Sequence, residues 1–208
     1  MQAEFARVLD LQTQYSASNT PQMQERGVLI RTTIPNQLSG YRAALEGALG
    51  EFGGELSFEG RDGTGRKTLV PWVRAYSGQF SASAQDGWYC VYLFRHDGTA
   101  VSLCLTHGST TFDGSTFKPR SPAEAATLVA WARNVVGANA TASGFVPGVD
   151  LGSVASLAQA YEQTTAYSKT YPVGSIPPDG QLVADMAAAL GLLRPIYAQA
   201  RLGRIPLE

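Results

Sequence analysis

Aromatic, hydroxyl and imidazole side chains come together at two points of the sequence, just before and just after a pair of apolar segments. Aromatic rings stack on flat rings such as nucleobases, and hydroxyl and imidazole groups hydrogen-bond the edges of such rings. Residues of these types therefore predict a recognition site for a flat, polar ligand. The alternative interpretation is that these residues are structural, because a histidine at the end of a strand often packs against its neighbours without binding a ligand. The residues concerned are Trp88, Tyr89, Thr106, His107 and Ser109.

A third stretch adds an aromatic residue and a cation to this set. Trp72, Arg74 and Tyr76 alternate along a segment typical of a β-strand, so they share one face of it. Such a face is suited to stacking a base or holding a phosphate. It is equally typical of a protein core that contains one ion-paired arginine. We include Trp72 and Arg74 among the residues expected at the recognition site.

Basic residues cluster although the chain as a whole has a formal net charge of −1. Between residues 61 and 74 there are four positive residues and one negative residue. A locally basic site can hold phosphate groups even on a protein that is not basic overall. Ordinary solvated surface charge is the alternative. The phosphate contacts that we expect come from Arg61, Arg66, Lys67 and Lys118.

The sequence lacks the motifs that several kinds of catalysis require. The segment 61–68 resembles a phosphate loop, but it lacks the required glycine spacing and leads into a strand rather than a helix, so we reject nucleotide hydrolysis. There is no cluster of carboxylates near a lysine, no zinc-ligand spacing and no Gly-x-Ser-x-Gly elbow. A Ser-His-Asp site stays open, because such triads are assembled in space. We expect no catalytic residue, no metal and no cofactor.

A β-hairpin is the element expected to position the two groups of aromatic, hydroxyl and imidazole residues. Residues 87–94 and 100–106 are rich in aromatic and β-branched residues, and Asp97-Gly98 between them favours a two-residue type I′ turn. This turn pairs Phe94 with Val101 and Trp88 with His107. Both faces of the pair are largely apolar, which predicts cover on both sides. The register puts the two cysteines on opposite faces, so we expect no disulfide.

The remaining elements predict an α+β fold, with a central, mostly antiparallel sheet that contains the buried hairpin and is flanked by N-terminal, middle and C-terminal helices. Strands are expected over 56–59, 69–76 and 167–173, and a mobile surface loop over 60–67. Residues 154–161 form either a strand or a short helix. The expected helices are 3–16, 21–33 with Thr20 as N-cap, a separate helix from Pro35 to Leu49, one capped by Ser121 that ends near Val136, and 179–201.

Length and composition fit one globular domain over residues 1–208, with a helical part over about 1–50, a sheet-centred part over about 55–175 and a C-terminal helix over about 179–201. Hydrophobic residues make up 44% of the chain and charged residues 16%. No apolar run approaches the roughly 18–20 residues of a membrane span. The first residues do not have the pattern of a secretory signal, so we expect a cytoplasmic protein. The oligomeric state stays open.

Three segments of the chain resemble the McrB-like (MrcB) N-terminal domain family of modification-dependent (type IV) restriction proteins. They are 69–74 with its Pro-Trp pair, 83–94 with Gln85 and the aromatic strand, and 101–108. The segments 11–16 and 167–178, followed by Leu182 and Asp185, are similar to the family's opening helix and its closing segment. Thr106-His107 departs from the family's Asn-Gln pair, and the basic residues of the glycine-rich loop also differ. These departures leave open a preference for a different modification.

The resemblance implies a module that binds double-stranded modified DNA for a type IV restriction system in phage defence. The expected modifications are altered cytosines such as 5-methylcytosine and 5-hydroxymethylcytosine, read after the base is flipped out. Cutting would reside on a nuclease domain or subunit, in cis or in trans. Two alternatives remain: a nuclease or hydrolase that acts on modified DNA directly, and a protein-interaction module that does not bind DNA.

Overall fold

A six-stranded antiparallel sheet in the order β1-β2-β3-β4-β8-β7 forms the centre of the protein in a computed structural model that describes residues 1–112, 115 and 117–206. A separate pair of strands, β5-β6, extends from the end of β4. The strands are β1 (Leu56–Arg61), β2 (Trp72–Ser77), β3 (Trp88–Phe94), β4 (Ala100–His107), β5 (Thr110–Phe112), β6 (Phe117–Pro119), β7 (Val146–Pro147) and β8 (Thr165–Pro172). This arrangement is the α+β fold that the sequence predicted.

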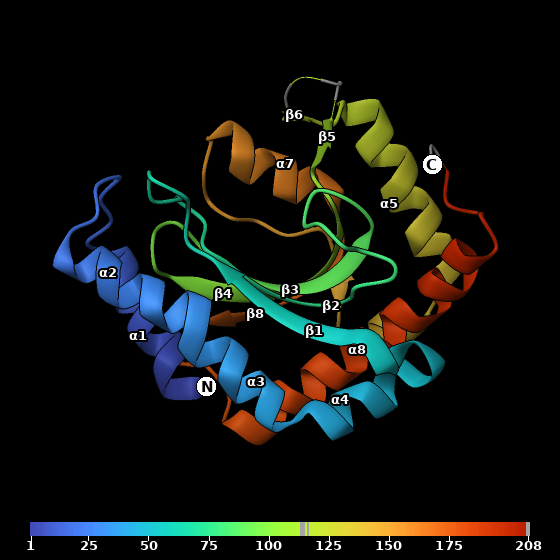
Figure 1. The fold of residues 1–208 in the computed structure, drawn as a ribbon, viewed down its shortest axis with the longest axis horizontal. Coiled ribbons are helices and arrows are strands. Elements are labelled where there is room, and N and C mark those ends of the chain that lie inside the picture. Colours follow the sequence, from blue (N-terminus) through green and yellow to red (C-terminus); the bar gives the residue numbers. More distant parts are fainter. Residues whose placement is uncertain (113–114, 116, 207–208) are drawn as a thin grey trace.

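The helices are distributed unequally over the two faces of the curved sheet (Figure 1). They are α1 (Gln2–Gln12), α2 (Pro21–Val28), α3 (Ile34–Gly40), α4 (Arg42–Leu49), α5 (Pro122–Val136), α6 (Asn139–Ala142), α7 (Ser156–Thr164) and α8 (Asp179–Arg201). α1, α3, α4 and α8 lie along the convex face, while α7 lies across the concave face. α5 packs against both α7 and α8. The concave face is therefore the less covered one.

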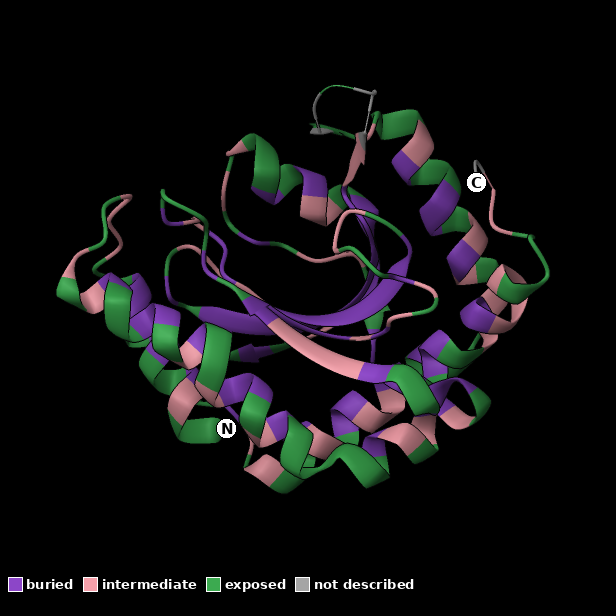
Figure 2. Cartoon of the chain, viewed as in Figure 1, coloured by how far each residue is buried: buried purple, intermediate pink, exposed green. Residues whose placement is uncertain are grey.

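Each face of the sheet has its own apolar cluster. The larger cluster joins the helices of the convex face to Tyr92, Phe94 and Leu103. The smaller cluster lies on the concave face and includes Val91 and Cys104. Figure 2 shows β3 and β4 buried along their lengths, which confirms the expected cover on both sides. The two cysteines are free and belong to different clusters, so the expectation of no disulfide is confirmed.

The hairpin has the predicted register but a different turn. Phe94 pairs with Val101 and Trp88 with His107, as expected. However, the Gly98 N–H donates to the Arg95 carbonyl at 3.1 Å, and the Arg95 N–H donates to the Ala100 carbonyl at 2.9 Å. The loop therefore has four residues and not two. Both loops are centred on the same Asp97-Gly98 pair, which is why the register is unchanged.

Pro35 does not separate two helices, contrary to the prediction. The chain is helical from α2 through Leu29–Thr33 into α3, and the helix ends near Tyr41. Residues 29–33 form a π-helical turn, in which the Ile34 N–H reaches the Leu29 carbonyl five residues back. A widened turn accommodates a proline, which has no N–H to donate and would crowd a regular helix.

Helix starts were the most predictable local feature. The Thr20 hydroxyl accepts from the Met23 N–H, and Ser121 and Glu124 form a capping box with Pro122 in the first turn. α8 has the bounds that the sequence predicted. Residues 154–161, left open between strand and helix, belong mostly to α7. No helix in the described part of the chain has the length and apolar character of a membrane span.

Candidate nucleobase pocket

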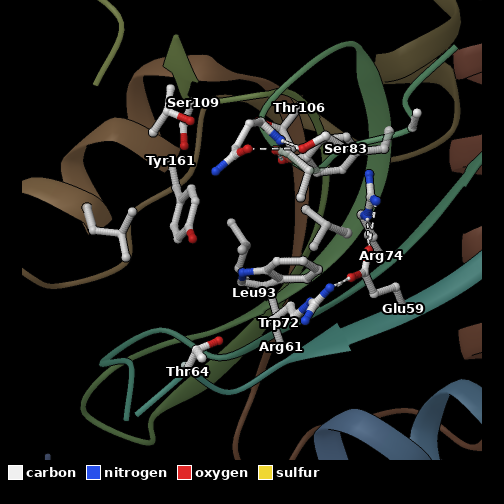
Figure 3. A pocket seen from close by; sticks show the side chains of 18 residues that line it. Glu59, Arg61, Thr64, Trp72, Arg74, Ser83, Leu93, Thr106, Ser109 and Tyr161 are labelled. Carbon is white, nitrogen blue, oxygen red and sulfur yellow. Dashed lines mark hydrogen bonds and ion pairs between the residues drawn. The ribbon is translucent and has the colours of Figure 1, made fainter. Parts of the chain in front are cut away.

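The concave face of the sheet contains a pocket of about 430 Å³ (Figure 3). Its floor consists of side chains that are direct neighbours across strands: Arg61, Trp72 and Leu93 form one row, and Glu59, Arg74 and Val91 form the next. Tyr89 and Thr106 form a third row. The walls come from the loops at 63–64 and 82–85 and from α7. Small-molecule sites commonly have volumes of roughly 300–1,000 Å³, so this pocket has the size of a binding site.

One side of the pocket is aromatic and apolar. Trp72 of β2, Leu93 of β3 and Leu157 and Tyr161 of α7 line it. Burial raises the pKa of Tyr161 to about 12, so its phenol is neutral near pH 7 and can both donate and accept a hydrogen bond. Flat rings and aliphatic side chains of this kind are suited to holding a planar ring.

A carboxylate held by two arginines forms the charged corner. The Arg74 Nε and Nη2 donate to Glu59 Oε2 at 2.9 and 2.7 Å, and the Arg61 Nε donates to Glu59 Oε1 at 2.6 Å. Arg74 also donates from Nη1 to Ser81 and stacks its guanidinium over the Tyr76 ring at 3.6 Å. Its donors are therefore used within the protein. Arg74 positions Glu59, and Glu59 faces the pocket.

The Glu59 carboxyl is ionised near neutral pH. Burial alone would raise its pKa, but the hydrogen bonds and charge of Arg74, supported by Arg61, outweigh burial and lower the pKa below its ordinary value. An ionised carboxylate only accepts hydrogen bonds. The corner consequently favours a ligand edge that carries an N–H donor, with the exposed Arg61 beside it as a donor to a neighbouring acceptor.

Hydroxyl and amide groups line the opposite side. Ser83 and Gln85 come from the loop before β3, Thr106 from the end of β4, and Ser109 and Thr110 from the segment that follows it. Figure 3 shows Ser83, Thr106 and Ser109 across the pocket from Arg61 and Trp72. The Thr106 hydroxyl already donates to the Thr164 carbonyl at 3.0 Å, so it is engaged within the fold. The pocket thus combines an aromatic side, an anionic corner and a hydroxyl-rich side.

The loop that leads from β1 into the pocket rim is anchored, and not the mobile surface loop that we expected. Asp62 is fully buried and accepts from Arg26 Nε at 2.7 Å and from Lys67 Nζ at 2.8 Å. Arg26 also donates to the Thr68 carbonyl at 3.1 Å. This buried network ties the loop to α2, and it holds Gly63 and Thr64 at the rim.

Most of the expected recognition residues meet in this pocket. Trp72, Arg74, Tyr89, Thr106 and Ser109 all line it. Trp88 and His107 do not, because successive strand residues point to opposite faces. Those two rings pack edge to face with centroids 5.3 Å apart, and Trp88 also contacts Trp131 of α5. Trp88 is 1% exposed and His107 0%, so both lie in the convex-side core.

The expected phosphate-binding residues are in different settings. Arg61 lines the pocket, and its side chain is 60% exposed. Arg66 is exposed on the rim loop, and Lys118 is exposed on β6. Lys67 is 8% exposed, with its ammonium on Asp62, so it faces the interior rather than the solvent.

Several pocket residues were absent from the residues predicted from sequence, among them Glu59, Gln85, Thr110 and Tyr161. Glu59 had a usable signal, because pairing of the edge strand with the Trp72 strand places Glu59 opposite Arg74. Tyr161 had none, since it reaches the pocket on a helix that crosses the sheet. No group of three or more metal-binding side chains occurs in the described ranges.

The concave, less covered face of the curved sheet thus carries a pocket lined by aromatic rings and hydrogen-bonding groups. Residues 10–198 match the MrcB-like, N-terminal domain family, and the chain belongs to that family. At the level of the family, this membership supports a role in recognising modified DNA in restriction. No curated protein and no solved structure gives a significant match to the chain.

Proposed function

We propose that this domain reads double-stranded modified DNA for a type IV restriction system by taking an altered cytosine, flipped out of the duplex, into the concave pocket. The pocket carries the proposal. It lies between α7, the 82–85 loop and the sheet, and we expect a base to enter it only after leaving the base stack. Enzymes and readers that need access to a whole base extrude it, at a cost of a few kcal/mol for unstacking.

The chemistry of the pocket suits a cytosine-type edge. Trp72 and Tyr161 offer rings for stacking, which is worth roughly 1–3 kcal/mol per base. The ionised Glu59 would accept from an exocyclic amine, as acidic side chains accept from the N4 amine of cytosine. Arg61 would donate to the adjacent ring nitrogen. An amine beside an acceptor is the Watson–Crick edge of cytosine, and of adenine as well.

DNA phosphates would be held at the pocket rim and beside it. Arg61, Arg66 and Lys118 are exposed there and would supply the salt-dependent part of the affinity. Lys67 could contribute only if its pair with Asp62 opened. Trp88 and His107 would support the site from the core side of the hairpin. Cutting is assigned to a nuclease domain or subunit in cis or in trans, and the domain itself acts as the reader.

Binding to matched duplexes tests the reader function directly. We expect fluorescence anisotropy to show at least roughly tenfold tighter binding to a duplex with one modified cytosine than to its unmodified twin, because each specific polar contact contributes about 1–3 kcal/mol. A 2-aminopurine placed beside the modified base should brighten on binding, since base extrusion unstacks its neighbour. Equal affinity for all modified and plain duplexes would contradict the proposal.

The salt dependence of binding tests the phosphate contacts. In the double variant R61A/R66A, the slope of log Kd against log salt concentration should fall by about 1–2, because each lost phosphate contact removes slightly less than one released counterion. The preference for modified over plain DNA should persist in the single variant R66A, because Arg66 does not line the pocket. Arg201 is the matched control, because it lies on α8 against the other face. An unchanged slope in the double variant would remove both arginines from the DNA interface.

A further inference from the structure

Val154 is an apolar residue that the fold leaves in solvent beside the pocket. It is 92% exposed, the largest value among the exposed large hydrophobic residues of the described chain. A single exposed apolar residue needs no explanation by itself. Val154 differs because of its position three residues before Leu157, which lines the pocket and is 40% exposed. Three residues of extended chain span about 10 Å at most, so Val154 lies within that distance of a pocket wall.

The short segment that carries Val154 is fixed on both sides of it. Before it, Leu151 is fully buried, and its N–H donates to Glu162 Oε1 of α7 at 2.7 Å. After it, the Ala155 N–H donates to the Ser153 hydroxyl at 3.2 Å, directly before α7 begins. Val154 is therefore held in place at the tip of an anchored loop, which reduces the entropy that it would lose on binding.

The charge around Val154 indicates what kind of surface it could contact. The stretch from residue 151 to residue 161 contains no charged residue. By contrast, Arg61 and Arg66 are exposed on the loop whose Gly63 lines the same pocket. A cationic loop is suited to DNA phosphates, whereas an uncharged apolar tip is suited to the interior of a base stack.

We propose that Val154, supported by Leu157, enters the gap that the flipped base leaves in the duplex and packs between the neighbouring bases. Proteins that distort DNA frequently insert apolar side chains between base steps. The inference rests on the proposed function, because only an extruded base leaves such a gap. It assigns a DNA contact outside the pocket, to the bases that stay in the stack, and it does not depend on which modification is read.

Shortening and lengthening this side chain test the assignment. The probe is a duplex with one 5-methylcytosine or 5-hydroxymethylcytosine, whichever the wild type binds more tightly. Val154→Ala removes two methyl groups and should weaken binding roughly five- to fifteenfold, as expected for two methyl groups that are no longer buried. Val154→Leu fills the gap at least as well and should bind as tightly as the wild type or more tightly. Both variants should keep the wild-type melting temperature, because Val154 is exposed.

Val146→Ala is the matched control. Val146 is also exposed, at 58%, and it lies on β7, the edge strand two places beyond β4. It does not line the pocket, so this variant should bind the duplex like the wild type.

A duplex whose gap is already filled distinguishes a gap-filling residue from an ordinary surface contact. A pyrene nucleotide opposite the modified cytosine occupies the space of the whole base pair and forces the cytosine out of the stack. Val154 then has no gap to fill, so the wild type and Val154→Ala should bind this duplex alike. Fluorescence anisotropy with the normally paired duplex in parallel measures the difference.

The outcomes separate this inference from the proposed function. If Val154→Ala binds the paired duplex like the wild type, or loses as much affinity for the pyrene duplex as for the paired one, Val154 does not fill the gap. The reader function still holds in that case, provided that the wild type prefers modified to plain DNA. If the wild type binds modified and plain duplexes alike, the reader function fails, and the gap-filling role fails with it.

Discussion

Replacing Asp62 with alanine is expected to lower the free energy of unfolding by about 3–5 kcal/mol, the cost of leaving a buried charge without its partner. Arg26 is 0% exposed, and its guanidinium lies 2.6 Å from Asp62. Burial lowers the pKa of Arg26, and the Asp62 carboxylate opposes that shift. The alanine variant would leave this cation and the Lys67 ammonium in the interior with no counter-charge from Asp62.

Thermal and urea unfolding followed by circular dichroism measure this effect. A loss of 3–5 kcal/mol corresponds to a fall in Tm of roughly 6–20 °C for a chain of this size. Glu25→Ala is the control, because Glu25 pairs with Arg7 on an exposed surface, where ion pairs contribute little. An Asp62→Ala variant that melts like the wild type would show that the loop does not depend on this network.

The Asp62 network also connects stability to the pocket. The loop that it anchors carries Gly63 and Thr64 to the pocket rim, and the exposed Arg66 lies on the same loop. Below its lowered Tm, the Asp62→Ala variant should bind modified DNA more weakly than the wild type, because the rim is no longer held in one conformation. The loss should be larger than in the Glu25→Ala control.

Trp72→Ala should weaken binding to modified DNA by roughly 5- to 150-fold, which corresponds to the 1–3 kcal/mol of one base stacked on an aromatic ring. Trp72 lies on the pocket floor between Arg61 and Leu93, its neighbours across the strands. Its ring is only partly buried, so part of its surface is available to a ligand. Binding to plain DNA, which relies on phosphate contacts, should change much less.

Trp72→Phe is the matched control for that experiment. It keeps an aromatic face of smaller area, so binding should recover most of the loss. Both variants should be compared by their melting temperatures, since Trp72 also packs against the concave-side cluster. If alanine and phenylalanine weaken binding equally while the fold is retained, or if neither does, the base does not stack on this residue.

Local order could be predicted from the sequence wherever neighbouring residues decide it. The hairpin register followed from the Asp97-Gly98 pair, because the loop is centred on this pair and that centre aligns Phe94 with Val101. The cap at Ser121 and the start of α8 followed from capping and proline rules. The MrcB-like family was also visible in the sequence, since its motif lies on this same hairpin.

The tertiary structure decided which of these residues form one site. Alternation along β3 and β4 assigned Tyr89 and Thr106 to the pocket and sent Trp88 and His107 to the core, but only the unequal cover of the two faces shows which face is open. Glu59 lines the pocket with its carboxylate held by Arg74, and Tyr161 reaches the pocket because α7 crosses the concave face. Lys67, which sequence reasoning placed on a DNA surface, turned inward to a buried carboxylate. The physical reason is that a side chain's solvent exposure and charge partners depend on segments far away in the sequence, whereas turns, caps and strand periodicity depend on residues a few positions apart.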